Sequence, residues 1–333
     1  MKFEFYKGDG RQSSPDTPTQ LPVSQRERLM RPENYIADSG LVDACNVALL
    51  LGQPLLLTGE PGTGKTQFAS SLAWELGFGE PLKFETKSTS TVGDLFYHYD
   101  TLKRFQDAQS GVAADSALPY LTYNALGTAI LRTQDPQKVA DYLPDGFDHP
   151  GKTRSVVLID EVDKAPRDFP NDMLNELEQL YFRVPELGGV RLSADPALQP
   201  VIIITSNSEK DLPDAFLRRC IYYNIPFPPR DRLTEIVTGR LGAFTGGSSA
   251  FLDQALDLFY RLRAPASGLR KKPATAELLG WLLSLQKLAD GAENPFAVEG
   301  LAERTLSNLV KTAEDQARAA EILQLWLAQQ QSG

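Results

Sequence analysis

The stretch Thr58-Gly59-Glu60-Pro61-Gly62-Thr63-Gly64-Lys65-Thr66 decides the fold expected of this chain of 333 residues. The apolar residues 54–57 precede it and are typical of a buried strand, and residues 67–76 follow with the apolar spacing of a helix. A strand, a glycine-rich loop and a helix in this order form the context that a phosphate-binding loop requires. The stretch therefore predicts a nucleotide-binding α/β fold.

The residue types of the loop match the chemistry of a triphosphate bound with magnesium. Glycines let backbone amides approach the phosphates closely, and the helix that begins near Gly64 directs its free N–H groups and positive dipole end at them. Lys65 is placed to reach the β- and γ-phosphates, and Thr66 is placed to offer its hydroxyl to Mg²⁺. The residues expected to bind the nucleotide are Gly59, Glu60, Pro61, Gly62, Thr63, Gly64, Lys65, Thr66 and Gln67.

Composition excludes several other classes of protein. The length predicts two or three domains, and the formal net charge of −9 argues against general affinity for nucleic acid. The sequence has no apolar run long enough to span a bilayer, and its start is too polar for a signal peptide, so we expect a cytoplasmic protein. Cys45 and Cys220 form no metal or redox motif and are expected to be buried thiols. The sequence has only two histidines, His98 and His149, so we do not expect a histidine-based zinc site.

A second chemical landmark is the run from Ser155 to Glu161. Four consecutive apolar residues indicate a central parallel strand buried on both faces, and two carboxylates follow at its carboxyl end. Asp160 is placed to hold Mg²⁺ through water, and Glu161 to activate the attacking water. The alternative is an acidic strand end that caps a helix.

Another apolar strand, residues 200–205, ends in Ser206 and Asn207. Asn207 is placed to bond the γ-phosphate or the attacking water, and the alternative is an Asx-turn. Earlier in the chain, Tyr35 and Ile36 either form one wall of an adenine pocket or pack under the first helix.

The remaining local patterns predict the elements around these landmarks. Residues 1–20 suggest an edge strand and a connector, and residues 41–51 a helix with Ser39 as N-cap and Gly52 as its end. Residues 88–100 predict a loop with a short helix, either a surface loop with an aromatic staple or an insertion facing a pore or partner. A helix is expected over 116–134, a loop over 142–152, and a hairpin over 181–192 that turns at its glycines.

The run Pro226-Phe227-Pro228-Pro229 predicts a domain boundary, and the chain beyond it is helical. Helices are expected at 232–241, 250–262, 275–289 and 301–329. The basic turn Arg270-Lys271-Lys272 is either a phosphate contact or a solvated turn. We therefore divide the chain into an N-terminal extension (1–30), an α/β core (31–228) and a helical lid domain with a C-terminal helix (229–333).

These landmarks together resemble the AAA+ ATPases, and within them the MoxR-like, dynein-related branch. The resemblance covers about residues 31–290. It is carried by the loop Gly59 to Thr66, the run Val156 to Glu161, Thr205-Ser206-Asn207, the short helix with Arg218-Arg219 and the basic turn. An insertion after Glu85 and a hairpin before the Asn207 strand look like those of this branch. The resemblance implies a P-loop AAA+ core with a parallel sheet flanked by helices, followed by a smaller all-α lid.

The resemblance also implies roles for individual residues. Asn207 would match sensor 1, and Arg219 or Arg218 would match the arginine finger that completes the site of a neighbouring subunit. Lys272, Lys271 or Arg270 would match sensor 2 on the lid.

A finger that acts on a neighbour implies a homo-oligomeric ring, commonly a hexamer. Family members remodel other proteins, often with a partner that carries a von Willebrand A domain. Such a domain would belong to a separate protein here.

We therefore expect a Mg²⁺-dependent ATPase in which water is the nucleophile. Two alternatives stay open. One is a nucleotide-operated binding switch with very slow hydrolysis, and the other is a motor of the McrB type that acts with a DNA-binding partner. The acidic charge balance counts against the second.

Overall fold

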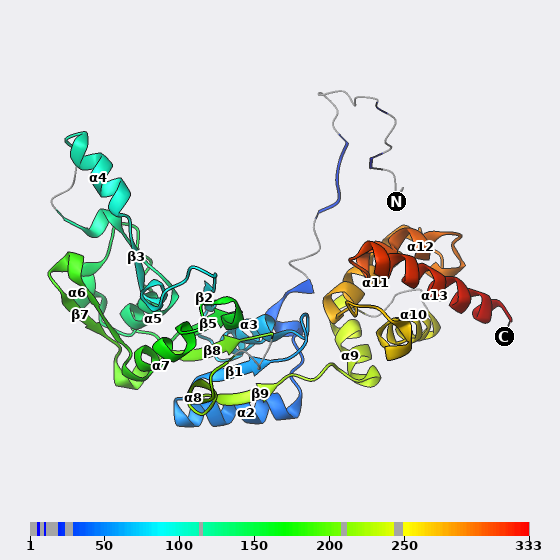
Figure 1. The fold of residues 1–333 in the computed structure, drawn as a ribbon, viewed down its shortest axis with the longest axis horizontal. Helices are drawn as coiled ribbons and strands as arrows, with labels where there is room; N and C mark the ends of the chain where they lie inside the picture. The colour runs from blue at the N-terminus through cyan, green and yellow to red at the C-terminus, as the bar shows by residue number, and fades with distance from the viewer. Residues whose placement is uncertain are drawn as a thin grey trace. The chain divides into compact units, whose positions relative to one another are not determined.

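A computed structural model describes residues 5–6, 10, 19–23, 29–112, 116–207, 212–242 and 249–332. The chain divides into two compact units (Figure 1). The α/β unit comprises Tyr35–Glu60 and Gly64–Pro226, and the helical unit comprises Met1–Asn34, Pro61–Thr63 and Phe227–Gly333. The strand predicted at the N-terminus falls largely outside the described residues, and Phe5 and Tyr6, which are described, lie in no strand.

The α/β unit is built on a five-stranded sheet in the order β2-β5-β8-β1-β9. All neighbouring strands in it are parallel. In chain order the strands are β1 (Leu55–Thr58), β2 (Leu82–Glu85), β5 (Val156–Asp160), β8 (Val201–Thr205) and β9 (Ile221–Asn224). Because β8 lies between β1 and β5, the carboxyl ends of these three strands meet side by side. The predicted parallel sheet flanked by helices is confirmed.

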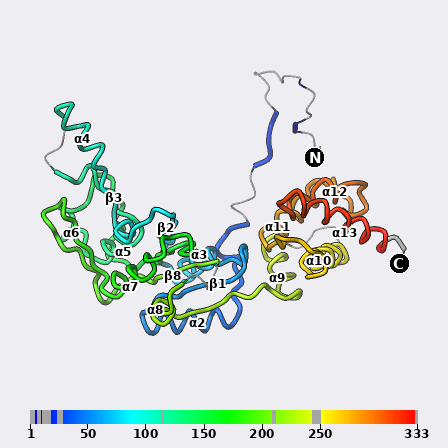
Figure 2. The backbone as a smooth tube through the Cα atoms, in the orientation of Figure 1, coloured from blue at the N-terminus to red at the C-terminus, as the bar shows by residue number. Residues whose placement is uncertain are grey.

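Helices cover both faces of this sheet (Figure 2). On one face α2 (Ser39–Leu51) and α3 (Lys65–Glu75) pack over Leu55 and Leu57. On the other, α5 (Ala125–Arg132) and α7 (Phe169–Gln179) pack over Leu56. Successive side chains of a strand point to opposite faces, so a run of leucines serves both layers. Each fully buried leucine contributes about 1.5–3 kcal/mol to stability.

The start of α2 differs from the prediction. Its N-cap is Asp38, not Ser39, and the Asp38 carboxylate accepts a hydrogen bond of 3.0 Å from Leu41 N. The same carboxylate oxygen accepts a bond from the Tyr223 hydroxyl of β9. A carboxylate satisfied by both the helix and the sheet outcompetes a neighbouring serine as the cap. The predicted end of α2 is confirmed, because Gly52 adopts the left-handed conformation with φ of 63°.

Between β2 and β5 the chain forms an insertion that the sequence predicted only in part. Strands β3 (Tyr97–Tyr99) and β4 (Leu121–Tyr123) pair antiparallel, and α4 (Thr101–Gln109) lies between them in the chain. The expected helix over 116–134 is therefore wrong at its start, where pairing with β3 holds residues 121–123 extended. The aromatic staple is present, since Phe96 is buried and stacks on Phe182 at 5.1 Å between ring centroids.

The predicted hairpin is confirmed as β6 (Tyr181–Val184) and β7 (Val190–Ser193). Its turn contains Gly188 and Gly189, with φ of 71° and 74°. Two short helices complete the α/β unit, α6 (Pro136–Val139) and α8 (Asp214–Leu217).

The helical unit has its own hydrophobic core. Its helices are α9 (Arg230–Leu241), α10 (Ser249–Arg263), α11 (Thr275–Leu288), α12 (Leu301–Thr305) and α13 (Ala313–Ser332). The single helix expected over 301–329 is wrong, because residues 306–312 separate α12 from α13. Thr312 explains the break: its hydroxyl accepts the Asp315 N–H at 3.2 Å and its carbonyl accepts the Gln316 N–H, which starts a new helix. None of the helices in the described ranges is long and apolar enough to cross a membrane.

Candidate nucleotide-binding and hydrolysis site

The glycine loop leaves β1 and leads directly into α3. Gly59, Gly62 and Gly64 all have positive φ, of 136°, 79° and 94°, which residues with a side chain rarely adopt. Gly64 is the N-cap of α3, so the free N–H groups of the first helical turn follow it. This local geometry supplies the amides and the positive helix end that a phosphate group needs.

Lys65 is buried, and its ammonium group lies over the loop that precedes it. Nζ donates to the carbonyl oxygens of Gly59 at 2.8 Å and Glu60 at 3.1 Å. Burial lowers the pKa of Lys65, although nearby carboxylates oppose the shift. Phosphate oxygens would offer this ammonium stronger acceptors than two neutral carbonyls do.

Thr66 and Asp160 meet at the carboxyl edge of the sheet. The Thr66 hydroxyl donates to Asp160 Oδ1 at 3.0 Å, which joins residues from α3 and β5. Thr205 donates to the same oxygen at 2.6 Å, and Lys83 Nζ lies 3.0 Å from Oδ2. Although burial raises the pKa of Asp160, bonds from Thr205, Lys83 and Thr66 hold it below its usual value. Asp160 is therefore a carboxylate at neutral pH.

This donor set fits a magnesium ion. A carboxylate and a hydroxyl are hard oxygen ligands, and Mg²⁺ in nucleotide sites takes one or two protein carboxylates and completes its shell with water and phosphate. Nowhere in the described residues do three His, Cys, Asp or Glu side chains gather as a metal site. Thr66 and Asp160 are the residues that would hold the ion.

Glu161 follows Asp160 in a left-handed backbone conformation, with φ of 58° and ψ of 51°. Its N–H donates to the Thr205 hydroxyl at 2.9 Å, which holds this turn against β8. Asn207 Nδ2 donates to Glu161 Oε1 at 3.4 Å, and Lys164 pairs with Oε2. A non-glycine residue in this region costs free energy, and such strain occurs frequently where a side chain must point at a reacting group.

Sequence reasoning gave no role to four residues of this site. Thr205 links Asp160 to the Glu161 backbone, Lys83 pairs with Asp160, Lys164 pairs with Glu161, and Asp163 accepts the Asn207 N–H at 3.1 Å. Thr205 carried a signal, because it is the last residue of an apolar strand beside Asn207. Lys83 carried none, because its approach to Asp160 depends on the parallel register of β2 and β5.

The two candidate finger arginines follow α8 and are exposed. Arg219 Nε lies 3.4 Å from Glu178 Oε1 of α7. Arg218 forms no ion pair in the described part of the chain. Among the described residues of the α/β unit, neither guanidinium group contacts Lys65 or Glu161. The role of either arginine in a neighbouring subunit therefore stays a prediction.

Tyr35 lies against the beginning of α3. Its ring makes an edge contact with Phe68 at 6.0 Å, and a Cβ on Gly64 would lie 3.0 Å from Tyr35 Cε2. Tyr35 thus borders the glycine loop, and it also packs against the hydrophobic cluster that α2 and α3 share. Both interpretations, a wall of an adenine pocket and packing under the first helix, α2, therefore stay open. Ile36 beside it is half-buried.

Lys272 belongs to the helical unit and is exposed. The Asp315 carboxylate fixes its turn by accepting the N–H groups of Arg270 at 3.0 Å and Lys271 at 3.1 Å. The proposed place of Lys272 beside a nucleotide stays a prediction.

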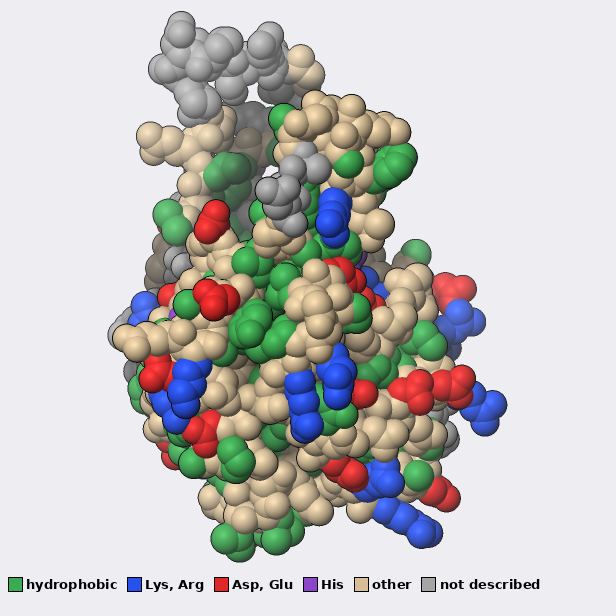
Figure 3. Space-filling model, turned by 90° about the vertical axis from the view of Figure 1, so that its left-hand side faces the viewer, with side chains coloured by type: hydrophobic (Ala, Val, Ile, Leu, Met, Phe, Trp, Pro, Cys, Tyr) green, Lys and Arg blue, Asp and Glu red, His purple; other side chains and the backbone are tan. Residues whose placement is uncertain are grey.

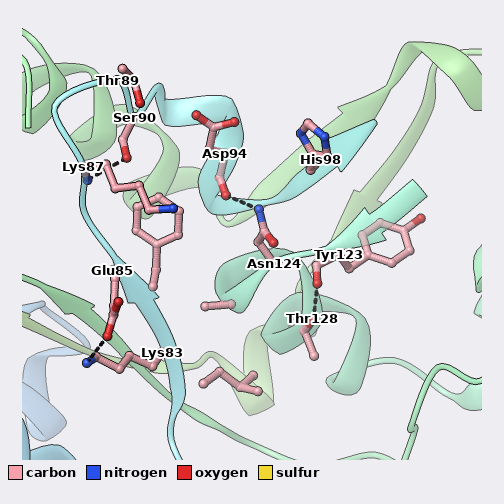
Figure 4. Close-up of a pocket in the computed structure, with 13 residues that line it drawn as sticks. Lys83, Glu85, Lys87, Thr89, Ser90, Asp94, His98, Tyr123, Asn124 and Thr128 are labelled. Carbon is pink, nitrogen blue, oxygen red and sulfur yellow. Dashed lines mark hydrogen bonds and ion pairs between the residues drawn. The ribbon is translucent and has the colours of Figure 1, made fainter. Parts of the chain in front are cut away.

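A cavity of about 880 Å³ lies beside β2, and no residue of the glycine loop is among those that line it (Figure 4). Lys83 and Glu85 line it from β2, and Asp94, His98, Asn124 and Thr128 line it from the insertion and α5. Lys83 pairs with Glu85 at 2.7 Å as well as with Asp160, so this lysine stands between the cavity and the predicted metal site.

Three features of this site define the class of P-loop nucleotide hydrolases. A glycine loop leads into α3, the Thr66 hydroxyl at the start of α3 meets the Asp160 carboxylate, and a second carboxylate, that of Glu161, lies beside Asn207. Within this class, the family model described as the AAA domain of the dynein-related subfamily matches residues 54–220. This match spans half of the chain, and the chain belongs to that family of ATP-hydrolysing enzymes. No curated protein matches the chain significantly. The predicted membership of the AAA+ ATPases is confirmed, and the narrower MoxR-like assignment stays a prediction.

Proposed function

We propose that this ATPase hydrolyses ATP with Mg²⁺ at the edge formed by α3, β5 and β8, and uses the reaction to remodel or activate a partner protein in the manner of MoxR-like ATPases. The observation that carries the catalytic part is the pair of contacts at this edge. Thr66 reaches Asp160 at 3.0 Å, and Glu161 is held beside them with Asn207.

The side chains divide the chemistry between them. Lys65 and the loop amides bind the β- and γ-phosphates, and Mg²⁺, when bound, neutralises charge on the same phosphates. Glu161 accepts a proton from water while the oxygen of that water attacks the γ-phosphorus. ADP leaves as the bond between the γ-phosphorus and the ADP oxygen breaks. Asn207 donates to the Glu161 carboxylate and so fixes its direction toward the water.

The ring is the second part of the proposal. Arg218 and Arg219 are exposed at the end of α8 and are thus accessible to another subunit. An arginine supplied by a neighbour is worth on the order of 10³–10⁵ in rate in other P-loop enzymes. We propose a homo-oligomeric ring, hexameric as is common in the family, in which Arg219 completes the site of the next subunit. The expected partner is a separate protein, either one with a von Willebrand A domain or a client that is remodelled.

The mass of the Glu161→Gln protein in solution, with and without ATP and Mg²⁺, tests this proposal. We expect ATP to bind without turnover and to drive assembly into a ring. Glu75→Gln, at the exposed end of α3, is the matched control and should hydrolyse ATP normally. Turnover of Glu161→Gln at the wild-type rate would remove Glu161 as the base, and a monomer with ATP bound would remove the ring.

A second experiment addresses the arginine. Arg219→Ala should lose hydrolysis and keep ATP binding, and mixing it with Lys65→Ala subunits should restore only a fraction of the sites. Full hydrolysis by Arg219→Ala, with loss in Arg218→Ala, would move the finger to Arg218.

One observation favours a slowly hydrolysing binding switch as the second candidate. Lys164 pairs with the same Glu161 carboxylate that must accept a proton from water. If this ion pair persists with ATP bound, turnover will be very slow. Lys164→Ala would then raise the rate of hydrolysis, whereas an unchanged or lower rate would argue against the switch.

A further inference from the structure

The hairpin β6–β7 places two arginines directly opposite each other. Its strands pair antiparallel with Arg183 across from Arg191, and both side chains are exposed. Like charges in directly opposite positions destabilise a hairpin. The repulsion gives these two charges no role in holding the strands together, which points to a contact outside the hairpin.

The backbone register brings these two side chains especially close. Ala194 N donates to Leu180 O at 2.9 Å, which makes Leu180 and Ala194 a hydrogen-bonded pair at the base of the hairpin. Bonded and non-bonded pairs alternate along an antiparallel ladder, so Arg183 and Arg191 form a non-bonded pair. The Cα atoms of such pairs are only about 4.5 Å apart, and their side chains are the closer set.

The hairpin is a firm support for these guanidinium groups. Phe182, Val184 and Leu192 alternate with the arginines and are buried in the core of the α/β unit. On the outer face, Arg191 lies over the Tyr181 ring at 3.9 Å from its centroid. Stacking engages the face of a guanidinium and leaves the N–H donors at its edge available to an acceptor.

No carboxylate of the described residues neutralises this pair. Neither arginine has an ion pair within those ranges, and Glu186, the acidic residue of the turn, accepts a bond from the Tyr97 hydroxyl at 3.1 Å. The side of the molecule that carries the hairpin displays exposed basic side chains among acidic and apolar ones (Figure 3). Two adjacent guanidinium forks are therefore open to an anion from outside the chain.

We propose that Arg183 and Arg191 bind neighbouring carboxylates of an acidic segment in a partner protein. Guanidinium forks match carboxylates in a bidentate way, which favours two arginines over two lysines. Nucleic acid is the less suitable occupant, because phosphate backbones are bound by extended basic stripes, whereas basic side chains on this side of the molecule stand among acidic ones and the chain has a net charge of −9. The proposal names the chemistry of the partner and rests on the remodelling role proposed above.

A labelled peptide of alternating Asp and Glu, titrated against the full chain at physiological ionic strength, tests the proposal by fluorescence anisotropy. A peptide of alternating Asn and Gln is the uncharged control. We expect the acidic peptide to bind, Arg183→Gln and Arg191→Gln to weaken it about ten-fold or more each, and added salt to weaken it further. Lys103→Gln, an exposed change of equal charge on α4, should leave the affinity unchanged.

Thermal unfolding of Arg183→Gln provides the second readout. Because this variant removes a like-charge pair and keeps the stack of Arg191 on Tyr181, its Tm should equal or exceed that of the wild type. A lower Tm would show that the pair serves stability and would overturn the proposal. Absence of peptide binding, or tighter binding of a single-stranded oligonucleotide that is lost in Arg191→Gln, would also overturn it.

These outcomes are independent of catalysis. Peptide affinity is measured without turnover, so a failure here leaves the ATPase proposal intact. Likewise, the Glu161→Gln substitution, which should remove turnover, leaves Arg183 and Arg191 of the hairpin in place.

Discussion

Replacement of Thr205 by valine removes one hydroxyl from the centre of the catalytic edge. Thr205 is only 1% exposed, and valine has nearly the same shape, so no cavity results. The hydroxyl donates to Asp160 at 2.6 Å and accepts the Glu161 N–H at 2.9 Å. Both partners remain after the substitution, and each loses a bond.

The cost follows from these two bonds. An unsatisfied N–H costs about 1–3 kcal/mol, and the lost bond to a carboxylate is worth about 1.5–3 kcal/mol. Thr66 and Lys83 still bond the Asp160 carboxylate, so we expect a total loss of about 3 kcal/mol, near the low end of the combined range of about 2.5–6 kcal/mol. For a domain of this size that loss lowers Tm by about 6–12 °C.

The effect on catalysis separates binding from chemistry. The Thr205 bond anchors the strained turn at Glu161, and a displacement of about 1 Å in a catalytic group can cost on the order of 10² in rate. We expect kcat to fall by about 10–100-fold with little change in KM for ATP, because no described hydrogen bond joins Thr205 to the glycine loop.

Steady-state ATPase assays and thermal unfolding of Thr205→Val and Thr205→Ser measure both effects. Serine keeps the hydroxyl and loses only a methyl group, so it should retain most of the activity. Equal losses of kcat in the two variants would refute the role of the hydroxyl, as would wild-type turnover by Thr205→Val.

Four further outcomes follow from the contacts and the burial of single side chains. Lys65→Ala removes the ammonium from the loop and should weaken binding of a fluorescent ATP analogue by about 100-fold or more, and retained affinity would contradict the loop assignment. Tyr223→Phe removes the sheet-to-helix bond to Asp38 and should lower the free energy of unfolding by about 1 kcal/mol in urea titrations, with ATPase activity unchanged. Burial raises the pKa of Cys45 to about 11 and of Cys220 to about 12, so a thiol reagent at pH 8 should react only after denaturation. The raised folded-state pKa values also make stability depend on pH. The free energy of unfolding has its full value, as far as the two thiols are concerned, below their unfolded pKa of 9.0, and it falls as pH rises toward 11–12.

Local patterns predicted well where one short segment carries the whole signal. The glycine loop, the apolar strands and the β6–β7 turn each depend on residue types a few positions apart. Prediction failed where a distant partner decided the conformation. Residues 121–123 are extended because β3 pairs with them, and Asp38 caps α2 because Tyr223 of β9 shares its carboxylate.

The sequence by itself determined the class of fold and the main nucleotide-binding loop, because these follow from spacing along the chain. It placed Lys65, Thr66, Asp160 and Glu161 in motifs without placing the motifs against each other. The tertiary structure decided that β8 lies between β1 and β5, and so joined Thr66 to Asp160 across 94 positions. The linking role of Thr205 and the approach of Lys83 to Asp160 likewise depend on strand order and parallel register, which are set by the packing of the whole sheet.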